Sequence, residues 1–156
     1  NPKPLKKNNK LISSTLIRKL ISKGNLKKVN NYLNRNWSIE GKVLRGRKMA
    51  RKIGFPTCNI SLNDYVIAKT GVYAVKVFIN NKKNFVRGIA NLGYRPTFNQ
   101  KKILLEVNLF NFSGNLYNKK LRVEFLKFIR KEVKFKGINQ LKKQIILDLK
   151  VAKRVK

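Results

Sequence analysis

The chain of 156 residues contains no histidine, and this absence excludes several kinds of site. Zinc sites of the usual kinds take histidine or several cysteines as ligands, whereas this sequence has one cysteine, Cys58. Nucleophilic triads built around histidine are excluded for the same reason. A single cysteine also excludes an internal disulfide framework and fits a reducing compartment. We therefore expect a cytoplasmic protein.

Long apolar runs are missing as well. No stretch of 18 or more apolar residues occurs, so the sequence predicts no transmembrane helix and no membrane partner. The first ten residues are polar and no small-residue cleavage site follows an apolar run, so no signal peptide is expected. The sequence begins with Asn1 instead of methionine, and we expect it to be a piece of a longer protein.

Carboxylates are scarce, with 6 Asp and Glu against 38 Lys and Arg. If the protein is an enzyme with a general base, the base comes from this short set or from Lys, Tyr or Cys58. The six carboxylates are Glu40, Asp64, Glu106, Glu124, Glu132 and Asp148.

The formal net charge of +32 attracts polyanions, and nucleic acid is the obvious one. A basic nucleic-acid-binding β-barrel is therefore an open alternative, with Tyr73, Phe85, Tyr94 and Phe98 as stacking residues. The basic residues are nevertheless spread over every segment, and Lys, Asn and Ile are abundant together. This pattern favours a compositional drift, and we expect no specific nucleic-acid partner.

Apolar periodicity changes along the chain at about residue 36. Residues 13–35 have helical spacing with caps at Ser13 and Asn25, which predicts a short helical hairpin. After Trp37, side chains in segments 72–79, 103–110 and 121–128 alternate between two faces as in strands, and segment 85–90 is interpreted as a further strand. Residues 141–152 return to helical spacing. We predict a mainly β fold, a closed antiparallel Greek-key-like β-barrel with a C-terminal α-helix.

The usual phosphate-binding motifs are absent, since neither a G-x-x-x-x-G-K-[ST] loop nor a G-x-G-x-x-G turn occurs. In their place, residues 41–59 read as a strand, a basic loop and a Gly-Phe-Pro turn. Thr57 and Asn59 are two apart and point the same way if the segment is extended. Their oxygens suit Mg²⁺, although the spacing alone favours a turn in which both side chains bond local backbone.

Several segments in the same order resemble the riboflavin kinase family. Gly54-Phe-Pro-Thr-Cys-Asn59 is similar to its G-F-P-T-A-N signature. Five further segments also resemble the family: Gly71-Val-Tyr73, Asn91-Leu-Gly-Tyr-Arg-Pro-Thr-Phe98, Leu105 to Phe112 with the following Leu116-Tyr117, Phe128 to Phe135, and Gln144 to Asp148. The resemblance covers residues 39–152 and implies a kinase that converts riboflavin and Mg-ATP to FMN and ADP.

The resemblance also implies roles for particular residues. Thr57 and Asn59 would hold Mg²⁺ and the ATP phosphates, with Gly46 and Arg51 as further nucleotide-binding residues. Glu106 would be the catalytic base that accepts the proton of the ribityl 5′-hydroxyl, although an exposed strand glutamate is the alternative from the residues alone. Arg130, Glu132 and Phe135 would lie in a flap over the flavin.

Two features qualify the resemblance. Ala50 stands where bacterial members of the family usually have glycine, which leaves a catalytically lost remnant of the fold as another alternative.

Residues 12–18, Ile-Ser-Ser-Thr-Leu-Ile-Arg, resemble the end of the FMN adenylyltransferase domain of bifunctional bacterial FAD synthetases. We therefore expect residues 1–36 to be the tail of that missing domain and residues 37–156 to be the kinase domain. The adenylyltransferase domain would precede this chain in the full-length protein, and no such activity is expected here.

Overall fold

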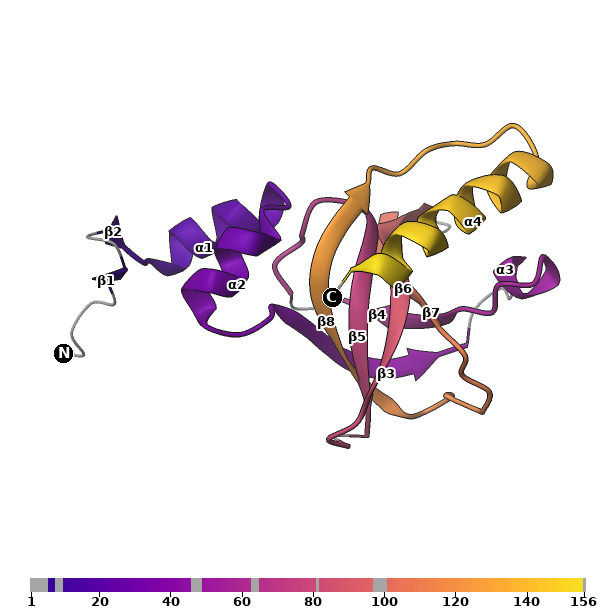
Figure 1. Ribbon diagram of the computed structural model, residues 1–156, viewed down its shortest axis with the longest axis horizontal. Coiled ribbons are helices and arrows are strands. Elements are labelled where there is room, and N and C mark those ends of the chain that lie inside the picture. Colours follow the sequence, from indigo (N-terminus) through magenta and orange to yellow (C-terminus); the bar gives the residue numbers. More distant parts are fainter. Residues whose placement is uncertain are drawn as a thin grey trace.

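The computed structural model describes residues 6–7, 10–45, 49–62, 65–80, 82–96 and 101–155. Figure 1 shows a β-barrel with helices α1 and α2 at one end and helix α4 along its outer side. The elements are, in chain order, β1 (Lys6–Lys7), β2 (Lys10–Leu11), α1 (Ser14–Ser22), α2 (Leu26–Leu33), β3 (Ser38–Leu44), α3 (Met49–Lys52), β4 (Cys58–Ser61), β5 (Gly71–Ile79), β6 (Phe85–Pro96), β7 (Lys101–Leu109), β8 (Lys120–Arg130) and α4 (Ile138–Arg154).

The barrel closes through strands in the order β3-β4-β7-β6-β5-β8, and every neighbouring pair is antiparallel. Alternation in the sequence decides which side chains fill the interior, because successive residues of a strand face opposite sides. Tyr73, Val75 and Val77 of β5 are at most 1% exposed, and Leu105 and Phe125 are fully buried. The predicted mainly β fold with a closed antiparallel barrel is therefore confirmed.

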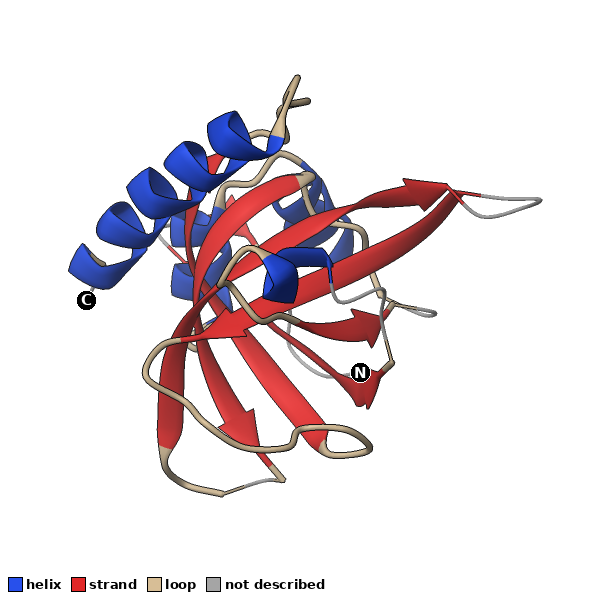
Figure 2. Cartoon of the chain, turned by 90° about the vertical axis from the view of Figure 1, so that its right-hand side faces the viewer, coloured by secondary structure: helices blue, strands red, loops and turns tan. Residues whose placement is uncertain are grey.

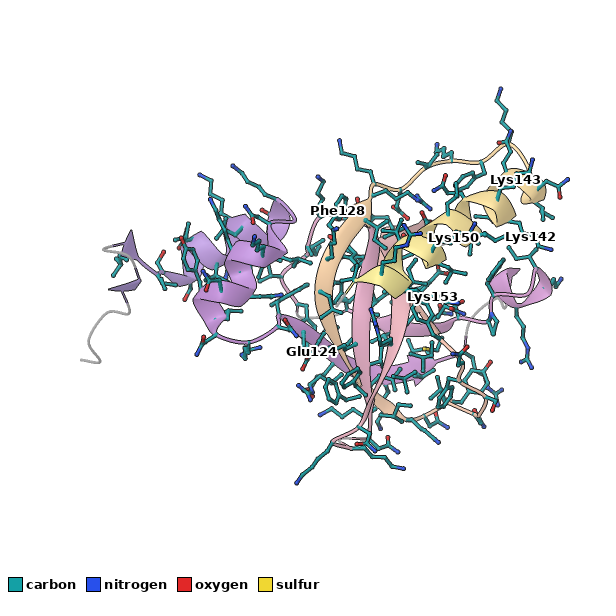
Figure 3. The ribbon with its side chains drawn as sticks, viewed as in Figure 1. Glu124, Phe128, Lys142, Lys143, Lys150 and Lys153 are labelled. Carbon is teal, nitrogen blue, oxygen red and sulfur yellow. The ribbon has the colours of Figure 1, made fainter. Side chains whose placement is uncertain are left out.

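Helix α4 packs against the outside of the barrel, where Figure 2 shows it lying across the strands. Its Ala152 is 1% exposed and packs with Val72, Ala74 and Ile89 of strands β5 and β6. The exposed part of the helix carries the lysines labelled in Figure 3 (Lys142, Lys143, Lys150 and Lys153), together with the apolar side chains of Ile146, Leu147 and Val151. The barrel thus has a second, smaller apolar layer outside its core.

The helical hairpin begins as predicted, because Ser13 and Asn25 accept hydrogen bonds from the first turns of α1 and α2. Its buried residues Ile21, Leu26 and Val29 belong to the same hydrophobic core as the barrel interior. Asn30 adds polar contacts, since its Nδ2 donates to the carbonyl of Phe125 at 3.1 Å and its Oδ1 accepts from the Trp37 amide at 2.8 Å. The hairpin therefore packs as part of the barrel.

Candidate functional site

A cavity of about 430 Å³ lies between the outer face of the barrel and helix α4. Strands β5, β6 and β7 form its floor, and α4 and residues 132–135 form its opposite wall. Most of its surface is apolar, with a few polar groups converging from the strands. Its lining residues are Lys52, Ile53, Phe55, Thr57, Val72, Ile89, Ala90, Asn91, Arg95, Glu106, Asn108, Arg130, Glu132, Val133, Phe135, Ile138, Leu141, Ile145, Asp148 and Leu149. Small-molecule sites have this size and character.

Three polar residues form a row across neighbouring strands at the cavity edge. Glu106 of β7 lies opposite Asn59 of β4 on one side and opposite Asn91 of β6 on the other. The Oδ1 atoms of Asn59 and Asn91 are buried, and neither has a hydrogen-bond partner among the described residues. A buried polar atom without a partner costs folding free energy, so both oxygens are suited to receive a ligand group.

Arg95 is paired with two carboxylates of this cavity. Its Nη2 lies 2.6 Å from Oε2 of Glu106, and its Nη1 lies 3.2 Å from Oε1 of Glu132. Burial acts to lower the pKa of Arg95, but the hydrogen bonds and charges of Glu106 and Glu132 outweigh it, so the pKa of Arg95 lies above its ordinary value. The guanidinium therefore stays charged and joins a strand to the segment that follows β8.

The carboxylate of Glu132 lies over strand β6. Asn91 donates a hydrogen bond to its Oε1 at 3.2 Å, as Arg95 does. Between these two residues, a side chain at position 93 would collide with the Glu132 carboxylate, and Gly93 leaves that space open. Residues 91, 93 and 95 share one strand face, so together they form a seat for Glu132.

Arg130 and Phe135 lie on the same side of the cavity as Glu132. The guanidinium of Arg130 is 5.8 Å from the centre of the Phe135 ring, and it binds the carboxylate of Asp148 on α4. Asp148 also accepts a hydrogen bond from Gln144 of the same helix. All three predicted flavin-binding residues therefore line the cavity.

Thr57 and Asn59 fit a magnesium ion by the chemistry of their oxygens. Thr57 lines the cavity and is exposed, whereas Asn59 is 9% exposed and carries the unpartnered Oδ1. A hard cation that keeps several waters needs few protein ligands, and neutral oxygens are suitable ones. The buried amide oxygen beside Glu106 is the observation that favours such an ion over a purely local turn.

The structure gives less support to the other two predicted nucleotide-binding residues, Arg51 and Gly46. Arg51 lies in α3, is exposed, and is not among the residues that line the cavity. Gly46 lies outside the described residues. Ala50 lies in the helical backbone of α3, a conformation that alanine adopts more readily than glycine does.

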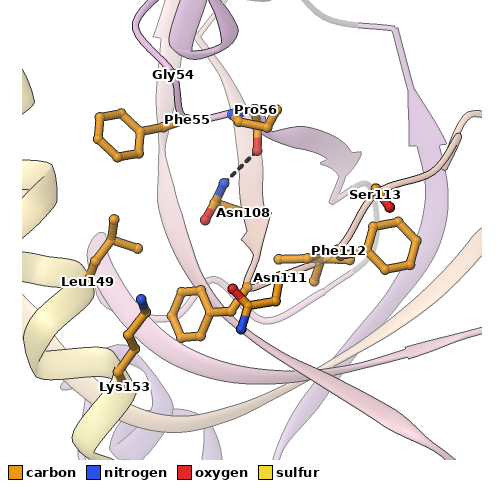
Figure 4. A pocket seen from close by; sticks show the side chains of 11 residues that line it. Gly54, Phe55, Pro56, Asn108, Asn111, Phe112, Ser113, Leu149 and Lys153 are labelled. Carbon is orange, nitrogen blue, oxygen red and sulfur yellow. Dashed lines mark hydrogen bonds between the residues drawn. The ribbon is translucent and has the colours of Figure 1, made fainter.

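A second cavity of about 430 Å³ adjoins the first and shares Phe55, Asn108 and Leu149 with it. Figure 4 shows Asn108 bonded to the carbonyl of Pro56, at 2.7 Å, between the Gly54–Pro56 turn and the residues that follow β7. The contact fixes the turn that carries Thr57.

The stacking residues of the nucleic-acid alternative are not gathered on one surface. Tyr73 is fully buried inside the barrel, whereas Phe85 and Tyr94 are 45% and 46% exposed near opposite ends of β6. Phe98 lies outside the described residues. Within the described part of the chain, no helix combines the length and the apolar character needed to cross a membrane.

Sequence reasoning assigned no role to Asn91, Gly93, Arg95 or Asn108, although all four lie in segments that it singled out. The available signal was their spacing of two, which places residues 91, 93 and 95 on one face of a strand. Their common partner, Glu132, is far away in the sequence, so the spacing alone did not reveal it.

The comparisons with known proteins agree with one another. A family model for riboflavin kinase (flavokinase) matches residues 33–156. A bifunctional riboflavin kinase/FMN adenylyltransferase of Haemophilus influenzae is 46% identical over 142 residues, covering 91% of this chain and 46% of that protein. The protein of the same description from Bacillus subtilis is 41% identical over 154 residues, covering 96% of this chain and 48% of its own length. The chain thus spans about half the length of the curated relatives it matches.

Two solved structures are similar to this fold. A Streptococcus pneumoniae protein described as a macrolide-efflux protein is 34% identical, with a TM-score of 0.88 over 98% of this chain and 50% of its own. A riboflavin kinase of Trypanosoma brucei has a TM-score of 0.52, covering 74% of this chain and 76% of its own, and at 20% identity it supports the fold alone.

Proposed function

The chain belongs to the riboflavin kinase family, and we propose that it transfers the γ-phosphoryl group of ATP to the 5′-hydroxyl of riboflavin to form FMN. The observation that carries this proposal is the position of Glu106. It lies between a neighbouring strand residue with an unpartnered buried oxygen, Asn59, and the largely apolar cavity under α4. A base in this position has the phosphate donor on one side and the hydroxyl acceptor on the other.

Glu106 would accept the proton of the ribityl hydroxyl as the oxygen attacks the γ-phosphorus, while the bond from this phosphorus to the β–γ bridging oxygen breaks and ADP leaves. Its side chain is 31% exposed and lines the cavity, so a bound hydroxyl can reach it directly. Phosphoryl transfer depends on positioning and on neutralising charge more than on covalent help. One oriented carboxylate that acts as the base is therefore all that the protein needs to supply to the ribityl hydroxyl.

Thr57 and Asn59 would hold Mg²⁺ together with the ATP phosphates. When bound, the ion would neutralise the negative charge of the phosphates. Arg51 and Gly46 would also bind the nucleotide, and the basic residues Arg51 and Lys52 of α3 would add positive potential for the phosphates. The bond from Asn108 to Pro56 supports this role, because it fixes the turn before Thr57.

Riboflavin would occupy the cavity under α4. The apolar side chains of Ile138, Leu141, Ile145 and Leu149 suit the ring system, and Phe135 lies beside them. Arg130, Glu132 and Phe135 would form the flap that covers the flavin and excludes water, which competes with the hydroxyl as acceptor. The unpartnered Oδ1 of Asn91 is suited to accept a hydrogen bond from a ribityl hydroxyl.

Two further proposals concern the whole protein. Residues 1–36 would be the end of a preceding FMN adenylyltransferase domain, and residues 37–156 would be the kinase domain. The chain alone would make no FAD, and its substrates fit a location in the cytoplasm. A fraction of the cell extract free of membranes should contain both the protein and the riboflavin kinase activity.

The test is a direct assay of the purified chain. Riboflavin, ATP and Mg²⁺ are incubated with it, and the flavins are separated by chromatography. FMN that appears only with both ATP and Mg²⁺ supports the kinase, and a simultaneous search for FAD tests the absence of adenylyl transfer. Riboflavin that binds but stays unphosphorylated would favour the remnant. Failure to bind flavin, with tight salt-dependent binding of nucleic acid, would favour the nucleic-acid alternative.

A further inference from the structure

Arg95 is the one cation that the described structure places in contact with both Glu106 and the segment after β8. Its two Nη atoms reach different carboxylates, 2.6 Å to Glu106 and 3.2 Å to Glu132. Both contacts are made from one planar group, which fixes their relative geometry in a way that a flexible ammonium group does not. The arrangement couples a strand residue to a loop residue.

We propose that Arg95 is a positioning residue of the kinase reaction, which orients the carboxylate of Glu106 and holds residues 131–137 over the cavity through Glu132. The assignment of Glu106 in this inference rests on the proposed function. Arg95 holds the Oε2 atom of Glu106, so the proton of the hydroxyl would pass to Oε1. Orientation of a flexible glutamate before the reaction removes part of the entropic cost of reaching the transition state.

The seat for Glu132 supports the second half of this inference. The carboxylate is held at two points, by Asn91 and Arg95, and the missing side chain of Gly93 gives it room between them. This contact, in which two donors hold one carboxylate, differs from an ordinary exposed ion pair, which adds little stability because water competes for both partners. It is the contact that fixes the start of the 131–137 segment to the barrel.

Because Arg95 contacts both Glu106 and Glu132, one substitution at position 95 should affect the strand residue and the loop residue together. Loss of the guanidinium frees the Glu106 side chain to take other rotamers, and it frees Glu132 at the same time. The expected kinetic result is a fall in kcat, because the base is misplaced in the bound complex. The KM for ATP should stay unchanged if Arg95 does not contact phosphate.

The experiment compares Arg95→Met with Arg122→Met in the whole chain. Arg122 is a matched control, since it pairs with Glu124 at 2.5 Å, its side chain is 35% exposed against 33% for Arg95, and it does not line the cavity. We expect kcat to fall about 100-fold for Arg95→Met, the effect of misplacing a reacting group by about an ångström. Arg95→Lys should recover part of this loss because it keeps the charge near Glu106, and Arg122→Met should leave kcat within about twofold.

A second measurement does not depend on activity. Limited digestion with trypsin, followed by mass spectrometry of the cuts after Lys131, Lys134 and Lys136, reports how firmly the segment is held, because a protease cuts a segment that detaches from the fold. Cleavage at these lysines should become about tenfold faster in Arg95→Met and Glu132→Ala, and also in Gly93→Ala, which displaces the Glu132 carboxylate while keeping its charge. Cleavage in Arg122→Met should match the unsubstituted chain, and thermal unfolding of each variant verifies that it is folded.

The outcomes separate the alternatives. A kcat loss shared equally by Arg95→Met and Arg122→Met would overturn the positioning role, as would a raised KM for ATP with an unchanged kcat, which indicates a phosphate contact. Unchanged tryptic cleavage of residues 131–137 in Arg95→Met and Gly93→Ala would overturn the role of Glu132. If the unsubstituted chain made no FMN, the proposed function would fail, and the cleavage comparison would still decide whether Arg95 holds the segment.

Discussion

Arg130 and Asp148 face each other between the end of strand β8 and helix α4, joined by three hydrogen bonds of 2.7 to 3.0 Å. Asp148 is 4% exposed and also accepts a hydrogen bond from Gln144 at 2.9 Å. Both oxygens of a buried carboxylate are thus satisfied by one fork-shaped donor and one amide. The pair holds α4 in the position in which the helix covers the cavity.

Asp148→Ala should therefore destabilise the fold strongly. Removing one partner leaves the other charge poorly solvated, which typically costs about 3–5 kcal/mol for a fully buried pair, and the 21% exposure of Arg130 puts the expected loss at or below the lower end of that range. Urea unfolding measures it. Glu40→Ala, which breaks the exposed pair with Lys120, should leave the unfolding midpoint unchanged.

Glu106→Gln should lower kcat by about 10² to 10⁴, the usual contribution of a general base. The substitution keeps the size of the side chain and removes its ability to take a proton at neutral pH. Glu40→Gln is the control, since Glu40 lies on β3 and does not line the cavity. Undiminished FMN formation by Glu106→Gln would show that Glu106 is not the base.

Asn59→Leu should weaken the binding of Mg-ATP without lowering the stability of the fold. Replacing a buried amide whose oxygen has no partner by an apolar side chain of similar size should leave the free energy of unfolding unchanged or raise it by about 1 kcal/mol. Calorimetric titration with Mg-ATP should show weakened binding in the same variant. Binding as strong as that of the unsubstituted chain would remove Asn59 from the proposed metal site.

Leu26→Ala tests whether the hairpin belongs to the barrel. Leu26 is 3% exposed and lies in the same core as the barrel interior, so we expect a loss of about 2–5 kcal/mol in a single unfolding transition. Lys27→Ala, at an exposed position of the same helix, is the control. If residues 1–36 were an independent tail, the transition of the barrel would not shift.

Cys58 should resist alkylation in the folded protein. Burial raises the pKa of its thiol from 9.0 to about 11, so at pH 8 about one thiol in a thousand is ionised, compared with about one in ten for a thiol at the ordinary value. Reaction with iodoacetamide, followed by mass spectrometry, should be slow at pH 8 and should accelerate toward pH 11. Rapid labelling of the folded chain at pH 8 would contradict the burial of this thiol.

Much of the architecture could be predicted because strand alternation is a local signal. Alternation over residues 72–79 predicted a strand, and β5 covers Gly71–Ile79 with Tyr73, Val75 and Val77 buried in the barrel. Element ends were less accurate, since β6 continues to Pro96 and α4 begins at Ile138. Strand pairing and the packing of α4, which are not local, decide where these elements stop.

The site was predictable only as far as the family resemblance reached. Glu106, Thr57 and the flap residues line one cavity, but the row from Asn59 through Glu106 to Asn91 depends on barrel register. The contacts of Arg95 join β6 to a loop that follows β8, and nothing in the spacing of charges indicates them. Long-range contacts of this kind follow from topology, which propensity and periodicity do not encode.

Gly93 has a consequence for which sequences this fold can accept. Its missing side chain and the Glu132 carboxylate occupy the same space, so the two positions form a size constraint between distant parts of the chain. In a library randomised at both positions and selected for growth without external FMN, larger residues at 93 should be recovered only with smaller residues at 132. The residues at positions 93 and 132 would then covary in size.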